Sequence, residues 1–181
     1  MYLGIDPGHT GGAVIWDGQY ACLCWEWKRA GDGYVIRSVP GDPHERNSSP
    51  RIGRTKVADL SVVAMRLATE ARRSRVHTIV LEAMYIPAKV LGAASVLRAS
   101  EARGILSQVH MWTGTTLIEP TSTQWRKKVW GKSPPSRGEA KKQARTYAQT
   151  VDGMTLPKSD HACEALCMAE YGRLIQTEEQ G

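Results

Sequence analysis

The 181-residue sequence contains no run of about 18 consecutive apolar residues, the length at which an apolar segment becomes a candidate membrane-spanning helix. Its first residues also lack a basic stretch followed by an apolar one, the pattern typical of a secretory signal peptide. We therefore expect neither a membrane span nor export, and we expect the protein to act in the cytoplasm.

Cysteine is scarce, and the C-x-x-C spacing typical of zinc sites is absent. The four cysteines form two close pairs, Cys22 with Cys24 and Cys163 with Cys167. Because tetrahedral zinc sites usually show tighter spacing, the pairs favour thiols buried in the core over a shared metal site.

Internal repeats and linkers between domains are also lacking, so we expect residues 1–181 to form one domain with a sizeable core. Hydrophobic residues make up 41% of the chain and charged residues 23%, which is ordinary for a globular protein. The formal net charge of +6 favours an anionic partner, although charge alone is weak evidence for nucleic-acid binding.

The apolar spacing predicts a mixed α/β fold. The expected strands cover 2–5, 13–16, 20–27, 76–81 and 115–119, and the expected helices cover 55–74, 90–109, 122–130, 139–151 and 158–175. Tight turns make the first three strands antiparallel, and a helical crossover makes the fourth parallel to the first. The result is a five-stranded sheet flanked by helices, with Thr55 as a helix N-cap and a long loop at 28–54 that includes a short extended piece at 34–36.

Acidic residues follow two strands of this sheet and one helix. Asp6 and Glu82 end neighbouring parallel strands and so emerge at one edge, while Asp160 and Glu164 share a face of the last helix. Each acid alone has an ordinary explanation as a turn former or a solvated charge. Carboxylates that converge on one point repel each other unless a cation lies between them, and oxygen ligands suit Mg²⁺ or Mn²⁺. Two such ions per site would serve phosphodiester hydrolysis, so the pattern indicates a metal-dependent nuclease.

Several segments resemble one family. They are GIDPG at 4–8, LEAMY at 81–85, LRASEARG at 97–104 and DHACEAL at 160–166. Together with the order of elements, they resemble the RuvC-type Holliday-junction resolvases of the RNase H-like superfamily, especially phage-encoded members, over nearly the whole chain. The resemblance implies a homodimeric endonuclease for four-way and other branched DNA, working in recombination or repair in the cytoplasm, or in the host cytoplasm if a phage encodes it.

The resemblance also implies a ligand set. Asp6, Glu82 and Glu164 correspond to metal-binding acids, with Asp160 or His161 as a further ligand. Many bacterial members place that ligand three residues before the last acid, where this chain has His161, and phage-like members place it four before, at Asp160. An oxygen ligand suits Mg²⁺ better, which favours Asp160 with His161 assisting.

DNA contacts are implied in the same way. Tyr85 falls where the resolvases carry an aromatic residue that stacks on bases, and Lys141 or Lys142 falls where they carry a lysine near the scissile phosphate. Other candidate DNA contacts are basic residues in or next to the predicted helices: Arg98, Arg103, Arg126, Lys127, Lys128 and Lys132. The alternatives are a packed tyrosine, solvated helix faces, and tryptophans at 125 and 130 that belong to the core.

Three rival functions follow from the same residues. The turn at 8–12, GHTGG, loosely fits the phosphate turn of actin-like and sugar-kinase ATP-binding proteins. Those proteins need a second homologous domain for which 181 residues leave no room, so we expect no nucleotide cofactor. A non-catalytic branched-DNA-binding or packaging module of the same fold is the second rival, and a general flap nuclease is the third.

Overall fold

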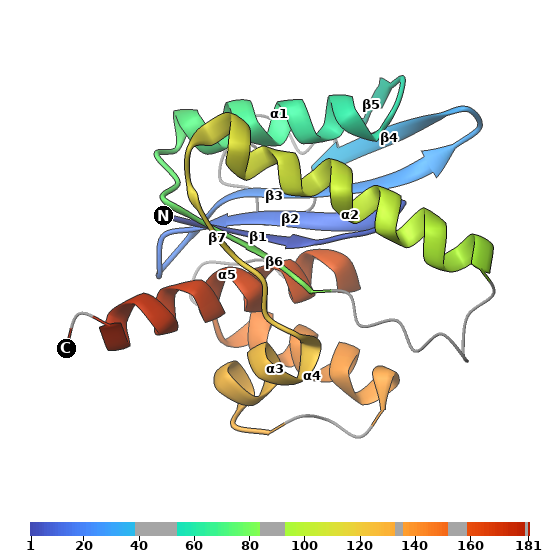
Figure 1. Ribbon diagram of the computed structural model, residues 1–181. Coiled ribbons are helices and arrows are strands. Elements are labelled where there is room, and N and C mark those ends of the chain that lie inside the picture. Colours follow the sequence, from blue (N-terminus) through green and yellow to red (C-terminus); the bar gives the residue numbers. More distant parts are fainter. Residues whose placement is uncertain (39–53, 84–92, 133–135, 152–158, 180) are drawn as a thin grey trace.

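The computed structural model describes residues 1–38, 54–83, 93–132, 136–151, 159–179 and 181. Within these ranges a seven-stranded sheet in the order β5-β4-β3-β2-β1-β6-β7 forms the middle layer (Figure 1). Neighbours from β5 to β1 are antiparallel, whereas β6 is parallel to β1 and β7 is parallel to β6. The predicted mixed sheet is therefore confirmed, with two more strands than expected.

The strands are β1 Tyr2–Asp6, β2 Thr10–Trp16, β3 Ala21–Ala30, β4 Gly33–Ser38, β5 Arg54–Val57, β6 Thr78–Leu81 and β7 Thr116–Ile118. The two additional strands, β4 and β5, lie within the predicted long loop and at the predicted start of a helix. The short extended piece expected at 34–36 is confirmed, because it lies inside β4. Gly31 adopts a positive φ of 64° in the turn that lets β3 continue into β4. β5 then pairs with β4, which lies far from it in the sequence.

The helices are α1 Leu60–Arg73, α2 Ala93–Thr113, α3 Ser122–Trp130, α4 Arg137–Thr150 and α5 Asp160–Glu179. The prediction that Thr55 caps α1 is wrong, because Asp59 accepts a hydrogen bond from the backbone N–H of Val62 and Thr55 belongs to β5. The bounds of α3 match the prediction, since Thr121 and Gln124 form a capping box at its start. No helix in the described ranges has both the length and the apolar character needed to cross a membrane.

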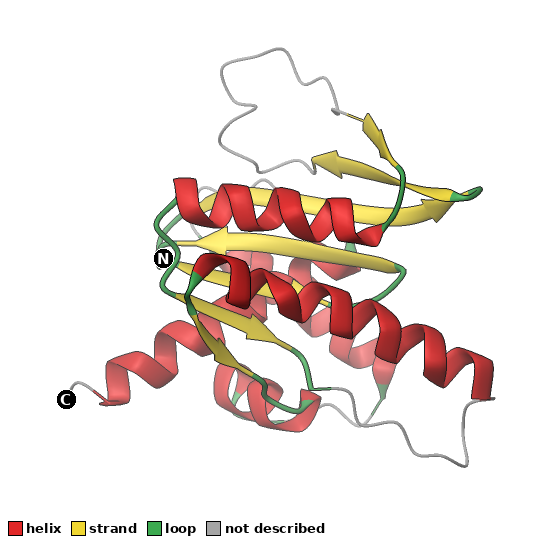
Figure 2. Ribbon diagram, turned by 45° about the horizontal axis from the view of Figure 1, so that its top comes forward, coloured by secondary structure: helices red, strands yellow, loops and turns green. Residues whose placement is uncertain are grey.

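The helices form a layer on each face of the sheet. Helices α1 and α2 cover one face, and α5 covers the other with α3 and α4 packed against it (Figures 1 and 2). Side chains that alternate along a strand feed the two cores, so Ile15 packs on the α1 side and Val14 on the α5 side.

The cysteines lie in or near the packed interior. Cys24, Cys163 and Cys167 are buried, and Cys22 is half-buried. Burial raises the pKa of the Cys163 thiol to about 12, which keeps it protonated and unreactive. These positions agree with the buried thiols that the spacing favoured.

Two glycines let α5 lie directly on the strands. A Cβ atom at Gly4 would stand 1.9 Å from the carbonyl oxygen of Ala165, and one at Gly12 would stand 2.7 Å from the carbonyl carbon of His161. Any larger residue would push the helix away from the sheet. The close contact brings the first turn of α5 beside the end of β1, where Asp6 lies.

Candidate active site

Asp6 and Glu82 emerge at the same edge of the sheet because β1 and β6 are parallel neighbours. Ile5 pairs with Leu81 in the register, and each acid is the next residue along its chain. The backbone around Glu82 is anchored on two sides. The Ala83 N–H donates to the carbonyl oxygen of Pro120 at 2.8 Å, and Arg103 Nε donates to the carbonyl oxygen of Glu82 at 3.4 Å.

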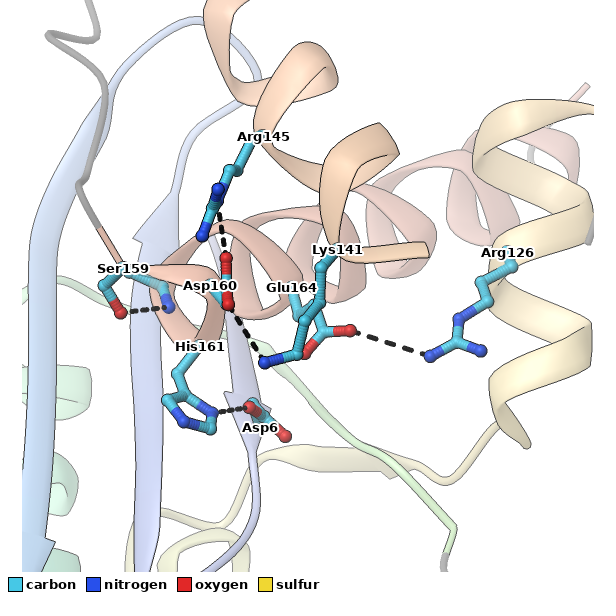
Figure 3. Close-up of polar contacts among 9 residues, drawn as sticks. Asp6, Arg126, Lys141, Arg145, Ser159, Asp160, His161 and Glu164 are labelled. Carbon is cyan, nitrogen blue, oxygen red and sulfur yellow. Dashed lines mark hydrogen bonds and ion pairs between the residues drawn. The ribbon is translucent and has the colours of Figure 1, made fainter. Parts of the chain in front are cut away.

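The first turns of α5 bring two further side chains to this edge. Asp6, His161 and Glu164 each offer one ligand atom, and these atoms all lie within 4.8 Å of one another. His161 Nδ1 lies 2.5 Å from Asp6 Oδ2 (Figure 3). Carboxylate oxygens with one imidazole form a donor set that Mg²⁺ or Mn²⁺ accepts.

Two of the acids at this edge, Glu82 and Glu164, hold their protons unusually tightly. Burial, followed by the charge of Asp6, raises the pKa of Glu82 to about 7. The same two causes raise the pKa of Glu164 above its ordinary value. The hydrogen bond to Asp6 raises the pKa of His161. The site therefore has too little positive charge for its carboxylates, and a divalent cation fits both the donor set and this deficit.

Arg126 supplies part of the missing positive charge. Its guanidinium lies 3.6 Å from a carboxylate oxygen of Glu164 (Figure 3). It also lies 5.1 Å from the centre of the Trp125 ring. Trp125 is fully buried with its ring edge against Trp130, which agrees with the core alternative for this tryptophan. Arg126 was predicted as a phosphate contact, but in the structure it faces an acid of the cluster.

Asp160 belongs to a separate group of charges on the α4 side. It accepts hydrogen bonds from Lys141 Nζ at 2.9 Å and from Arg145 Nε at 2.5 Å (Figure 3). Burial alone would raise the pKa of Asp160, but these two cations outweigh it and lower the pKa. Asp160 is thus paired with cations of α4, whereas the adjacent His161 lies against Asp6.

The other predicted DNA contacts divide into three groups. Tyr85 lies outside the described residues. Two cations pair with acids, Arg103 with Glu119 and Lys128 with Glu178. The remaining predicted contacts, which are Arg98, Lys127, Lys132 and Lys142, have exposed side chains on the surface.

The sequence did not single out Arg145 or the pairing of Arg126 with Glu164. Lys141 and Arg145 are four residues apart and so share one face of α4, which is a signal that the sequence does contain. Which acid that face meets depends on how α4 packs against α5, and no local pattern shows this.

The sheet order, with acids at the edge where β1 and β6 end beneath α5, defines a RuvC-like fold of the RNase H type. RuvC of Thermus thermophilus is similar over 98% of this chain and 96% of its own, with a TM-score of 0.57 and 14% identity. The same protein in complex with a Holliday junction substrate gives a TM-score of 0.64 at 15% identity, over 99% of this chain and 96% of its own.

A more distant structure is the yeast mitochondrial Holliday junction resolvase Ydc2, with a TM-score of 0.43 and 11% identity over 99% of this chain and 80% of its own. No protein-family model matches the chain, and no curated protein matches it in sequence. At these identities the likeness to RuvC shows the fold.

Proposed function

We propose that this chain is a divalent-metal-dependent endonuclease that hydrolyses phosphodiesters in four-way junctions and other branched DNA. The observation that carries the proposal is the grouping of Asp6, His161 and Glu164 within 4.8 Å at one sheet edge. Glu82 ends the neighbouring strand there, and its pKa and that of Glu164 are both raised in part by the charge of Asp6. RuvC, which has the same fold, has been solved with a Holliday junction substrate, and this supports branched DNA as the substrate class.

Asp6, Glu82 and Glu164 would hold the metal, with Mg²⁺ as the resident ion, Mn²⁺ as a substitute, and two ions per site. When bound, the ions supply Lewis-acid stabilisation of the charge that develops on the phosphate oxygens. The fourth ligand was predicted to be Asp160, and that stays a prediction. The distances favour His161, because it shares the cluster with Asp6 and Glu164.

The cations around the cluster have distinct tasks in this proposal. Arg126 offsets the charge of Glu164 when the acids are ionised. Asp160 orients Lys141, whose ammonium then lies at the edge of the site, where it stabilises negative charge on a bound phosphate. In the metal-free chain, His161 lies against Asp6 and fixes the orientation of that carboxylate.

The proposal extends to the whole chain. Residues 1–181 act as one nuclease domain in the cytoplasm, and two copies form a homodimer through α2. A homodimer suits a substrate with two equivalent strands to cut.

Asp6→Asn tests the assignment. The substitution removes a central carboxylate, so we expect cleavage of a synthetic four-way junction in Mg²⁺ to fall at least about 100-fold. Loss of a residue that merely supports a metal ligand already costs about 10- to 100-fold, and Asp6 is proposed as a ligand itself. Junction binding should persist or tighten, because the variant repels phosphate less. Asp32→Asn, in the exposed turn after β3, is the matched control. An Asp6→Asn protein that still nicks the junction at the normal rate would show that this site does not carry the reaction.

A further inference from the structure

A basic groove lies on the α5 side of the sheet, where β3, β4 and β5 continue beyond the strands that α5 covers. It has a volume of about 300 Å³ and is lined by Thr10, Glu26, Trp27, Lys28, Val35, Arg37, Arg54 and Lys56. Helix α5 packs on β1, β2, β3 and β6, whereas α1 packs on β4 and β5 from the opposite face (Figure 1).

The alternation of side chains explains why this face is basic. Tyr34 and Ile36 of β4 and Val57 of β5 are buried in the core beneath α1. Their strand neighbours must point to the other face, which places Arg37 and Lys56 in the groove. The groove therefore depends on β5, which the sequence did not predict, and on β4, of which only the extended piece at 34–36 was expected.

The groove is aligned with the candidate active site. One row of paired residues crosses five strands in the order Asp6, Gly12, Glu26, Arg37 and Arg54. Neighbouring strands lie about 4.8 Å apart, so the backbone of Arg54 is roughly 19 Å from that of Asp6. His161 sits directly on Gly12, the second residue of this row. The row thus begins at the acid cluster and ends among cations.

Positive charge in the groove is only partly compensated. Four cations line it against one carboxylate, that of the buried Glu26, which pairs with Arg37. Lys28, Arg54 and Lys56 form no ion pair with any other described residue. Within the described ranges, three positive charges of the groove are therefore not compensated by an acid.

We propose that the basic groove binds the phosphodiester backbone of one arm of the nucleic-acid substrate, an inference that rests on the proposed nuclease function. A strand whose scissile phosphate lies at Asp6 runs along the row into the groove. At about 3.4 Å of helix axis per phosphate on each strand, roughly 19 Å corresponds to five or six nucleotides. An acidic protein segment would match the charges, but it would have no reason to align with the acid cluster.

Arg54→Gln combined with Lys56→Gln tests the groove. Both side chains are exposed on the edge strand β5, so the fold should tolerate the change. The matched control, Arg66→Gln with Arg73→Gln, removes the same charge from exposed positions on α1, across the sheet. Binding of a labelled four-way junction by the full chain is measured by fluorescence anisotropy in chelator over a range of salt, with melting curves to check folding.

The groove variant should bind about tenfold more weakly at low salt, and its salt slope should be shallower by roughly two, or about one per lost phosphate contact. The control variant should match the wild type. Two further substrates carry neutral methylphosphonate linkages five or six nucleotides from the mapped cut, one substrate on each side of the cut. Only the substrate modified on the side that enters the groove should bind the wild type more weakly. That modification should have little further effect on the groove variant, because its contacts are already lost.

An unchanged slope in a folded groove variant that still binds and cuts the junction would overturn the groove while leaving the nuclease function intact. Occupation of the groove by another part of this chain would give that same result. A wild-type chain that neither binds nor cuts branched DNA would overturn the function itself, and the groove with it.

Discussion

The protonation of Glu82 depends on its burial and on the nearby charge of Asp6. Its pKa is about 7 in the folded chain, against 4.5 for an ordinary glutamate. Because the folded state holds this proton more tightly than the unfolded state, its contribution to stability falls as the pH rises from 4.5 to 7 and stays low above 7. The ionised carboxylate then costs on the order of 1–3 kcal/mol unless a cation neutralises it.

Glu82→Gln should therefore stabilise the metal-free protein above pH 7 by on the order of 1–3 kcal/mol, and the gain should vanish near pH 4.5. Urea unfolding at both pH values in chelator measures this. Added Mn²⁺ should stabilise the wild type more than the variant. Glu179→Gln, an exposed acid at the end of α5, is the control. A Glu82→Gln protein that is less stable than the wild type above pH 7 would contradict the buried-charge account.

His161 and Asp160 are adjacent in sequence but lie in different electrostatic environments. His161→Ala removes a group that lies within ligand distance of Asp6 and Glu164, so we expect Mn²⁺ affinity to fall about 10- to 100-fold. Asp160→Asn releases Lys141 and Arg145 instead, so it should change Mn²⁺ affinity little and mainly lower kcat. Mn²⁺ titration alongside steady-state cleavage separates these effects. An equal loss of Mn²⁺ affinity in both variants would restore Asp160 as a ligand.

At the scale of elements, the sequence predicts best where signals are local. The capping box of Thr121 and Gln124 and the left-handed Gly131 delimit α3, and its predicted bounds are correct. Strand β5 has only four residues and its partner lies far away in the sequence, so its pairing was not visible. Acids at strand ends were predictable because parallel strands share an edge, whereas the partners of Asp160 depend on helix packing.

Gly4 fixes the distance between α5 and the sheet, and Gly4→Ala tests this. The new methyl group would meet backbone atoms of Ala165 and Ala169, which cannot rotate away as side chains can. We expect a loss of about 3 kcal/mol or more in the free energy of unfolding, together with weaker Mn²⁺ binding as His161 and Glu164 move from Asp6. Urea titration and Mn²⁺ titration measure the two effects.

Gly138→Ala is the control, because no described group apart from the adjacent helix backbone lies within 4 Å of the added methyl group, and the site is in the first turn of α4. It should change stability by no more than about 1 kcal/mol. Equal effects of the two substitutions would mean that α5 can move off β1 at little cost.

At the scale of the whole molecule, the outer side of α2 carries apolar side chains that no described element covers. Leu97 is 70% exposed and Met111 is 71% exposed. They are 14 residues apart, close to four helical turns, so they lie on nearly the same side of α2. Large exposed apolar groups of this kind mark association surfaces, which supports α2 as the contact in the proposed homodimer.

Leu97→Glu should then shift the chain toward monomers, since dimerisation would bury a carboxylate without a partner. Sedimentation equilibrium measures the shift, with Ser95→Glu on another side of α2 as the control of equal charge.

A dimer presents two sites to one junction, so it should linearise a cruciform-bearing plasmid within one encounter. A monomer should release nicked circles first, because each cut then needs a separate encounter. A Leu97→Glu chain that stays dimeric, or that linearises the plasmid as the wild type does, would place the contact elsewhere than the exposed side of α2.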